Sequence, residues 1–102
     1  MERQKVLERV KFAVHEVDKN ATVILFGSRV RGDYHNESDW DLLILTEMPE
    51  GWETWMMIRK KIYRAELDTE EIFNTVVHNK YEWEKYKLSP LYQFIKREGM
   101  KI

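Results

Sequence analysis

Hydrophobic and polar positions divide the first half of the chain into one helical and two extended segments. Valine and leucine residues recur at intervals of three and four from about residue 3 to 18, which predicts an amphipathic helix. Two short apolar runs follow, at residues 21–26 and 39–45, and both are typical of buried strands. The second run is apolar on both of its faces. We therefore expect a covering layer on each side of that strand near its end.

The same reading continues into the second half of the chain. A Pro-Glu-Gly turn at residues 49–51 separates the second strand from a helix expected over residues 52–64. Residues 67–70 are expected to form a connection, and residues 71–77 a third strand. Helical and extended segments therefore alternate along the chain.

The last segment is predicted to be helical. Residues 81–86 favour a short helical turn. Ser89 and Pro90 are typical of an N-cap and a first helical position, and Gly99 should end this helix after Glu98. The complete order of elements predicts an α/β (α+β) fold, in which a small mixed β-sheet carries helices packed mainly on one face.

Composition narrows the possible classes of protein. A length of 102 residues suits one domain, expected over residues 1–102, and 43% hydrophobic residues suit a folded core. The formal net charge of −1 gives no strong signal for nucleic-acid binding. Cysteine is absent, which excludes disulfides and thiolate metal sites. With no apolar run long enough for a membrane span and no signal-peptide core, we expect a cytoplasmic protein without membrane contact.

The candidate chemistry is concentrated between the first two predicted strands. A Gly27-Ser28 turn follows the first strand, and its backbone N–H groups and hydroxyl are suited to a phosphate. Asp39 and Asp41 flank Trp40, so their carboxylates should share one side of the second strand while Trp40 faces away. Two like charges this close repel each other unless they are compensated. Mg²⁺ held by one or two carboxylates and by substrate phosphates is a common compensation.

These residues resemble the signature of a known family. Gly27-Ser28, Arg31-Gly32 and the stretch Ser38-Asp39-Trp40-Asp41-Leu42 are similar to the motif of the polymerase-beta-like nucleotidyltransferases. More narrowly, the chain resembles the minimal nucleotidyltransferases, which are short proteins that stand alone. The flanking helix and strands suggest that the resemblance extends over the whole chain.

The resemblance implies a role for each motif residue. It implies that the aspartates bind catalytic divalent metals that hold a nucleoside triphosphate, while the turn contacts its phosphates. The arginine of the Arg-Gly pair is characteristic of the family, and Gly32 is expected to take a positive φ. The implied site comprises the catalytic, metal-binding Asp39 and Asp41 and the nucleotide-binding Gly27, Ser28, Arg31 and Ser38.

Structural explanations compete with these roles. The aspartates could be a loop or N-cap pair, and the Gly-Ser turn could be a plain strand-to-helix connection. The hydroxyl of Ser38 is expected to orient a carboxylate and not to react. Arg29 is expected to be a solvated charge.

The sequence departs from the family pattern at the third carboxylate. The resemblance implies one further acidic residue on the next core strand, completing a two-metal site. Counting back from Tyr81-Glu82-Trp83 places that position on Asn74, whose amide can coordinate through its oxygen but cannot act as a general base. Glu70 shares the face of Asn74 by alternation, but it lies about 13 Å away along the strand, which is too far to substitute directly. Asp68 and Glu66 are candidates only if the register of the strand differs. Asn74 is therefore the possible third-ligand position.

Candidate functions from three classes follow. The resemblance implies a nucleotidyltransferase that binds ATP or another triphosphate with Mg²⁺ and transfers a nucleoside monophosphate to a hydroxyl acceptor. It also implies a role as an antitoxin beside a HEPN-type helical toxin, which could be the acceptor. The alternative, favoured by Asn74, is a catalytically impaired domain that acts by binding a partner. A small-molecule modifying enzyme is a third class, but such enzymes usually need a further domain.

A protein contact is also expected from the predicted helix over residues 52–64. Its first turns contain Trp52, Trp55 and Met56, and a domain of this size has little core with which to cover them. A residual apolar patch is typical of a protein contact. Self-association and a second protein are both consistent with it.

Overall fold

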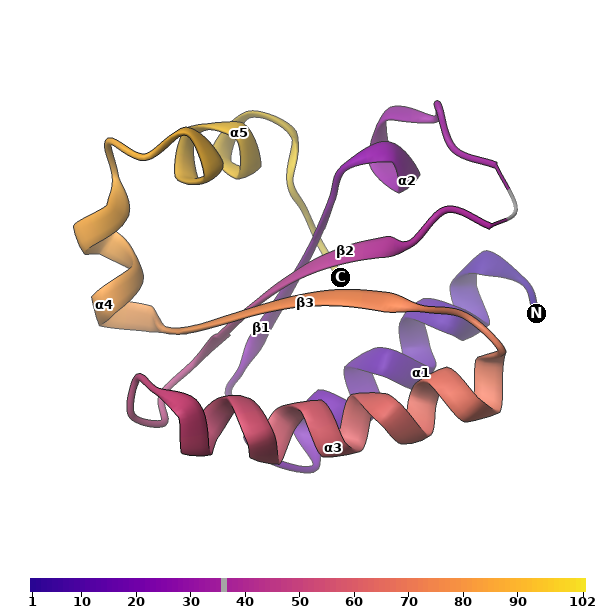
Figure 1. Cartoon of the computed structure of the whole chain (residues 1–102), viewed down its shortest axis with the longest axis horizontal. Helices are drawn as coiled ribbons and strands as arrows, with labels where there is room; N and C mark the ends of the chain where they lie inside the picture. The colour runs from indigo at the N-terminus through magenta and orange to yellow at the C-terminus, as the bar shows by residue number, and fades with distance from the viewer. Residues whose placement is uncertain (36) are drawn as a thin grey trace.

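The computed structural model describes residues 1–35 and 37–102 and contains a central mixed sheet. Its strands follow the order β3-β2-β1-β4 across the sheet (Figure 1). β1 is antiparallel to both β2 and β4, whereas β2 and β3 are parallel. The predicted small mixed sheet is therefore confirmed. The strands are β1 Thr22–Phe26, β2 Trp40–Thr46, β3 Phe73–Asn79 and β4 Met100–Lys101.

Helices cover both faces of this sheet unequally. The long helices α1 and α3 lie side by side below the sheet in Figure 1, and the shorter α2 and α5 lie above it. The prediction that helices pack mainly on one face is confirmed by the two long ones. The helices are α1 Arg3–His15, α2 Ser28–Arg31, α3 Trp52–Thr69, α4 Lys80–Trp83, which continues as a 3₁₀ turn over Glu84–Tyr86, and α5 Pro90–Glu98.

Alternating side chains of β1 and β2 build a separate core on each face. Val23 and Leu42 pack with residues of α1 and α3, while Leu43 packs with Trp83 and Ile95 above the sheet. Both Leu42 and Leu43 are fully buried. The expected cover on both sides of β2 is confirmed, and the larger core lies on the side of the long helices.

The helix α3 is longer than the hydrophobic pattern predicted. It runs to Thr69, so the expected connection over residues 67–70 is wrong. The inner face continues through the buried Ala65 and Thr69, and the Thr69 hydroxyl donates to the Ala65 carbonyl at 2.7 Å. Glu70 then ends the helix with a left-handed φ of 58°. Among the described residues, no helix is both long and apolar enough to cross a membrane.

Hydrogen bonds from side chains also shift two predicted boundaries. β3 begins at Phe73, two residues later than the predicted start at residue 71. At this point the Phe73 N–H donates to Glu66 Oε2 at 2.9 Å. α1 ends at His15, before the predicted residue 18, and Asp18 instead joins its loop to the end of β2. Asp18 accepts from the Thr46 hydroxyl at 2.6 Å and from two backbone N–H groups. Burial alone would raise the pKa of Asp18, but these hydrogen bonds lower it below its usual value.

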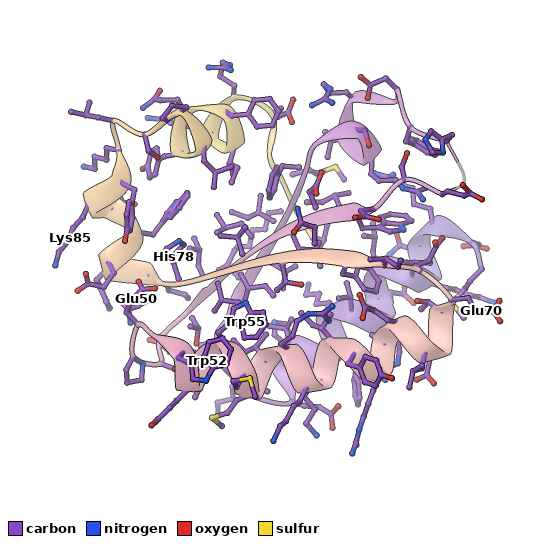
Figure 2. The ribbon with its side chains drawn as sticks, in the orientation of Figure 1. Glu50, Trp52, Trp55, Glu70, His78 and Lys85 are labelled. Carbon is purple, nitrogen blue, oxygen red and sulfur yellow. The ribbon has the colours of Figure 1, made fainter. Side chains whose placement is uncertain are left out.

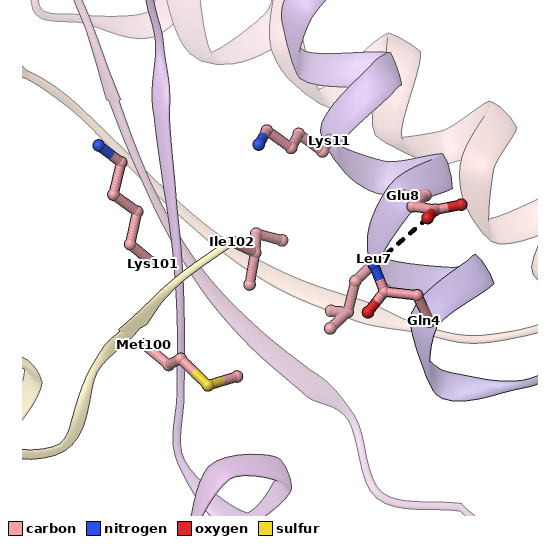
Figure 3. A pocket seen from close by; sticks show the side chains of 7 residues that line it. All are labelled: Gln4, Leu7, Glu8, Lys11, Met100, Lys101 and Ile102. Atoms are coloured by element: carbon pink, nitrogen blue, oxygen red, sulfur yellow. Dashed lines mark hydrogen bonds between the residues drawn. The ribbon is translucent and has the colours of Figure 1, made fainter.

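The C-terminal strand β4 was not predicted. Two residues after α5 pair with β1, and the Ile102 N–H donates to the Val23 carbonyl at 3.0 Å. Between β4 and α1 lies a pocket of about 420 Å³ (Figure 3). It contains none of the predicted site residues, and its lining comprises Gln4, Leu7, Glu8, Lys11, Met100, Lys101 and Ile102.

Candidate functional site

The second residues of β2 and β3 meet at the start of both strands. Asp41 pairs in register with Asn74, and the Asn74 amide donates to Asp41 Oδ1 at 3.0 Å. Asp41 alternates with Leu43 and so lies on the α5 side of the sheet, whereas Trp40 is buried among residues of the α1 and α3 core. Trp40 thus faces away from Asp41, as predicted. The position counted for a third ligand lies directly beside one of the two aspartates.

Asp39 precedes β2 by one residue and is exposed. The strand begins at Trp40, whose N–H donates to the Ile72 carbonyl at 2.9 Å, so the predicted start at residue 39 is one residue early. Asp39 therefore belongs to the loop that leads into the strand. It is accessible to a ligand from solvent.

Arg29 holds this loop, and the expectation that it is solvated is wrong. The residue is only 6% exposed, and its guanidinium donates to the Ser38 carbonyl from Nη2 at 2.8 Å. It also lies 4.3 Å from the centre of the Trp40 ring and 4.5 Å from that of Tyr34. Arg29 therefore fixes the backbone immediately before Asp39. A charge on so short a helix gave no local sign of this burial.

The turn at Gly27 contacts the Asp41 carboxylate. Gly27 has φ 82° and ψ −156°, a conformation that is essentially restricted to glycine. A Cβ atom placed there would lie 2.2 Å from Asp41 Oδ2. The predicted phosphate turn and the predicted metal carboxylate are thus in direct contact.

We expect Gly27→Ala to destabilise the protein by about 1–3 kcal/mol through backbone strain alone, and further by displacing Asp41. Gly32→Ala is the matched control. Gly32 also has a positive φ, of 87° as predicted, but a Cβ atom there meets nothing within 4 Å. Thermal unfolding of both variants measures the difference. Equal losses of stability would contradict the close contact between Gly27 and Asp41.

A carboxylate from the last helix also lies at this turn. The Gly27 N–H donates to Glu98 Oε1 at 2.8 Å, and Arg31 Nη1 lies 3.3 Å from the same oxygen. Arg31 also contacts Asp33 Oδ2 at 3.2 Å, and its hydrogen bond to Asp33, together with the charges of Asp33 and Glu98, raises the pKa of its guanidinium. Glu98 was not predicted as a site residue, because no local pattern connects it with a turn so far away in sequence.

Of the two serines of the motif, one lies at the start of α2 and the other in the loop between α2 and β2. Ser28 is half-buried and is the first residue of α2. Ser38 accepts a hydrogen bond on its hydroxyl from the His35 N–H at 3.0 Å. This bond stabilises the loop itself, and the orientation of a carboxylate by the Ser38 hydroxyl stays a prediction. Phosphate binding by Ser28 and Ser38 stays a prediction.

The donor set is suited to a Mg²⁺ ion that arrives with a phosphate ligand. In the part of the chain that the structure describes, no three acidic or histidine side chains are grouped to hold a metal. Asp39, Asp41 and the amide of Asn74 supply hard oxygen donors, and Mg²⁺ usually completes its shell with water and substrate phosphates. Asn74 donates its amide to Asp41 here and would have to turn its oxygen toward an ion. The residues fit such an ion but do not form a complete protein cage.

Comparisons with known proteins agree with this architecture. The family model of the nucleotidyltransferase domain matches residues 3–101. Over 33 residues the chain is 67% identical to Putative protein adenylyltransferase MJ0141 of Methanocaldococcus jannaschii, a segment that covers 31% of this chain and a third (33%) of that relative. A solved structure described as "Crystal structure of the toxin-antitoxin with AMP-PNP" has the same fold, with a TM-score of 0.66 and 15% identity over 98% of this chain and 72% of that one.

The family match extends from the first residue of α1 to the last residue of β4. The matched residues include the turn, both aspartates and Asn74. The chain belongs to the nucleotidyltransferase domain family.

Proposed function

We propose that this domain binds ATP, or another nucleoside triphosphate, with Mg²⁺ and transfers a nucleoside monophosphate to a hydroxyl group. The supporting observation is the contact between the Gly27 turn and the Asp41 carboxylate. It brings a group suited to phosphate next to a group suited to a cation. Asp39 and Asp41 would hold the ion, and Gly27, Ser28, Arg31 and Ser38 would bind the nucleotide.

In the proposed reaction, the acceptor oxygen forms a bond to the α-phosphorus of the triphosphate. The bond from that phosphorus to the oxygen bridging to the β-phosphate breaks, and pyrophosphate leaves with that electron pair. The hydroxyl proton passes to water, because the amide of Asn74 cannot accept it. When bound, Mg²⁺ would neutralise phosphate charge and strengthen the electrophilic character of the phosphorus. The protein's part is to hold the triphosphate in line with the acceptor.

The acceptor that we propose is a hydroxyl on a protein partner in the cytoplasm. The relative named above is called a protein adenylyltransferase, and the protein of similar fold is a toxin–antitoxin complex with AMP-PNP. Together with the resemblance to minimal nucleotidyltransferases, these names favour ATP as the nucleotide and a HEPN-type helical toxin as the partner.

An apolar surface at the start of α3 is suited to such a partner. Trp52 is 69% exposed and stacks on Trp55 with 5.2 Å between ring centres (Figure 2). Met56, one turn along, is half-buried. Exposed aromatic side chains of this kind act as anchors in protein interfaces. A second copy of the chain could use the same surface, which would give a homo-oligomer.

The transfer reaction can be tested with ATP labelled on the α-phosphate. We expect the domain, Mg²⁺ and the protein encoded by the adjacent gene to give a labelled partner, with the label on a hydroxyl side chain. Label on the γ-phosphate should not be transferred, because pyrophosphate leaves. Transfer of γ-label, or no transfer of α-label to a partner that forms a complex, would contradict the proposed reaction.

The neutral Asn74 supports a second candidate, a binding module without turnover. Such a module would neutralise its partner through contact alone. Asp39→Asn with Asp41→Asn separates the two candidates in cells. If the stable double variant no longer neutralises the activity of the partner, the transferase is supported. If it still neutralises that activity fully, the binding module is supported.

A further inference from the structure

On the basis of the function proposed above, we propose that Glu98 is an internal competitor for the nucleotide: its carboxylate occupies the phosphate position at the Gly27 turn and must leave when a triphosphate binds. The free domain would then be held in a self-occupied state. Binding a nucleotide would exchange one anion for another.

The contacts of Glu98 are those expected of a phosphate oxygen. One oxygen, Oε1, accepts from the Gly27 N–H at 2.8 Å and lies 3.3 Å from Arg31 Nη1. A backbone N–H and a guanidinium are also common partners of phosphate. Both groups were assigned to the nucleotide on sequence grounds, and both are bound to Glu98 in the structure. A phosphate and Glu98 cannot use them at once.

Electrostatics make this competition effective. The Glu98 side chain is only 18% exposed, so its charge is less screened by water than that of a surface carboxylate. Arg31 already faces Asp33 and Glu98, and Gly27 lies against Asp41. A triphosphate that approached this turn would therefore meet several carboxylates. Removing the charge nearest the turn should favour its binding.

The backbone around Glu98 is well anchored, so a rotation of its side chain is enough to open the turn. Glu98 is the last residue of α5, and Gly99 donates its N–H to the Ile95 carbonyl at 2.7 Å. The next two residues pair with β1 as β4. The Phe94 ring lies 5.7 Å from the Arg31 guanidinium and would support it once Glu98 has left. Arg31 is then available for a phosphate.

The test compares the wild type with Glu98→Gln and Glu98→Ala. The probe is α,β-methylene ATP with Mg²⁺, because its α–β bridge cannot be cleaved by transfer and binding is measured without turnover. Glu82→Gln, which removes one charge from an exposed pair with Lys85, is the matched control. We expect Glu98→Ala to bind the analogue about tenfold more tightly, or about 1.4 kcal/mol, Glu98→Gln to lie between, and the control to match the wild type.

Each outcome has a separate meaning. Equal or weaker binding by Glu98→Ala, in a variant whose thermal unfolding shows it to be folded, would overturn the competition while leaving the proposed function in place. Absence of binding by the wild type and all variants would overturn the proposed function and the competition with it. The amide signal of Gly27 in NMR spectra reports the contact itself, and it should move in Glu98→Ala but not in the control before any nucleotide is added.

Discussion

Replacing both aspartates, Asp39→Asn with Asp41→Asn, is expected to abolish Mg²⁺-dependent binding of ATP. The amides keep the size of the side chains but lose the charges that hold the cation. We expect at least a hundredfold loss of affinity, or about 2.7 kcal/mol, measured by calorimetry. The fold should persist, because Asp39 is exposed and because Asp41→Asn removes a negative charge without leaving a cavity in the core.

A matched control removes two carboxylates elsewhere. Glu53→Gln with Glu82→Gln changes the net charge by the same amount, at an exposed position of α3 and a half-buried position of α4. It should bind ATP as the wild type does. Equal affinity in the aspartate double variant and in this control would refute the assignment of the site.

Restoring a third carboxylate with Asn74→Asp is expected to raise the rate of transfer at least about tenfold, which is a lowering of the barrier by about 1.4 kcal/mol. The new carboxylate would replace an amide that now lies 3.0 Å from Asp41 Oδ1. Without an ion, the introduced carboxylate and that of Asp41 repel each other, so the variant should be less stable than the wild type. Mg²⁺ should restore the lost stability, and thermal unfolding with and without Mg²⁺ measures this independently of activity.

Asn20→Asp, at an exposed position of the loop before β1, is the control for added charge. It should change neither the rate nor the response to Mg²⁺. If the wild type transfers well and Asn74→Asp alters neither quantity, the third ligand lies elsewhere in the chain.

The parts of the fold that depend on local pattern were predictable. β1 follows from a short apolar run and the start of α5 from a capping residue, and the Ser89 hydroxyl indeed accepts from the Tyr92 N–H. The family resemblance placed the third-ligand position on Asn74 by counting along the chain, and the structure pairs this residue with Asp41.

The features that the sequence did not predict depend on contacts between distant segments. Glu98 is the last residue of α5, and β4 begins two residues later. Glu98 reaches Gly27 only because β4 pairs with β1 and so places the end of α5 beside that strand. Arg29 is buried because Tyr34, in the loop after α2, and Trp40, in β2, cover it. The additional length of α3 depends on the buried Ala65 and Thr69, which are small and leave a weak hydrophobic signal. None of these contacts has a short-range signature in the chain.

The most direct test of the account is an NMR titration of the isotope-labelled protein with α,β-methylene ATP, in the presence and absence of Mg²⁺. We expect saturable, Mg²⁺-dependent shifts of the amide signals of Gly27, Ser28 and Asp41, and we expect these shifts to be lost in the Asp39→Asn, Asp41→Asn double variant. Signals of residues around Trp52 should not move. Saturable shifts that fall instead on residues of the pocket between α1 and β4, or that persist in the double variant, would contradict a nucleotide site at the Gly27 turn.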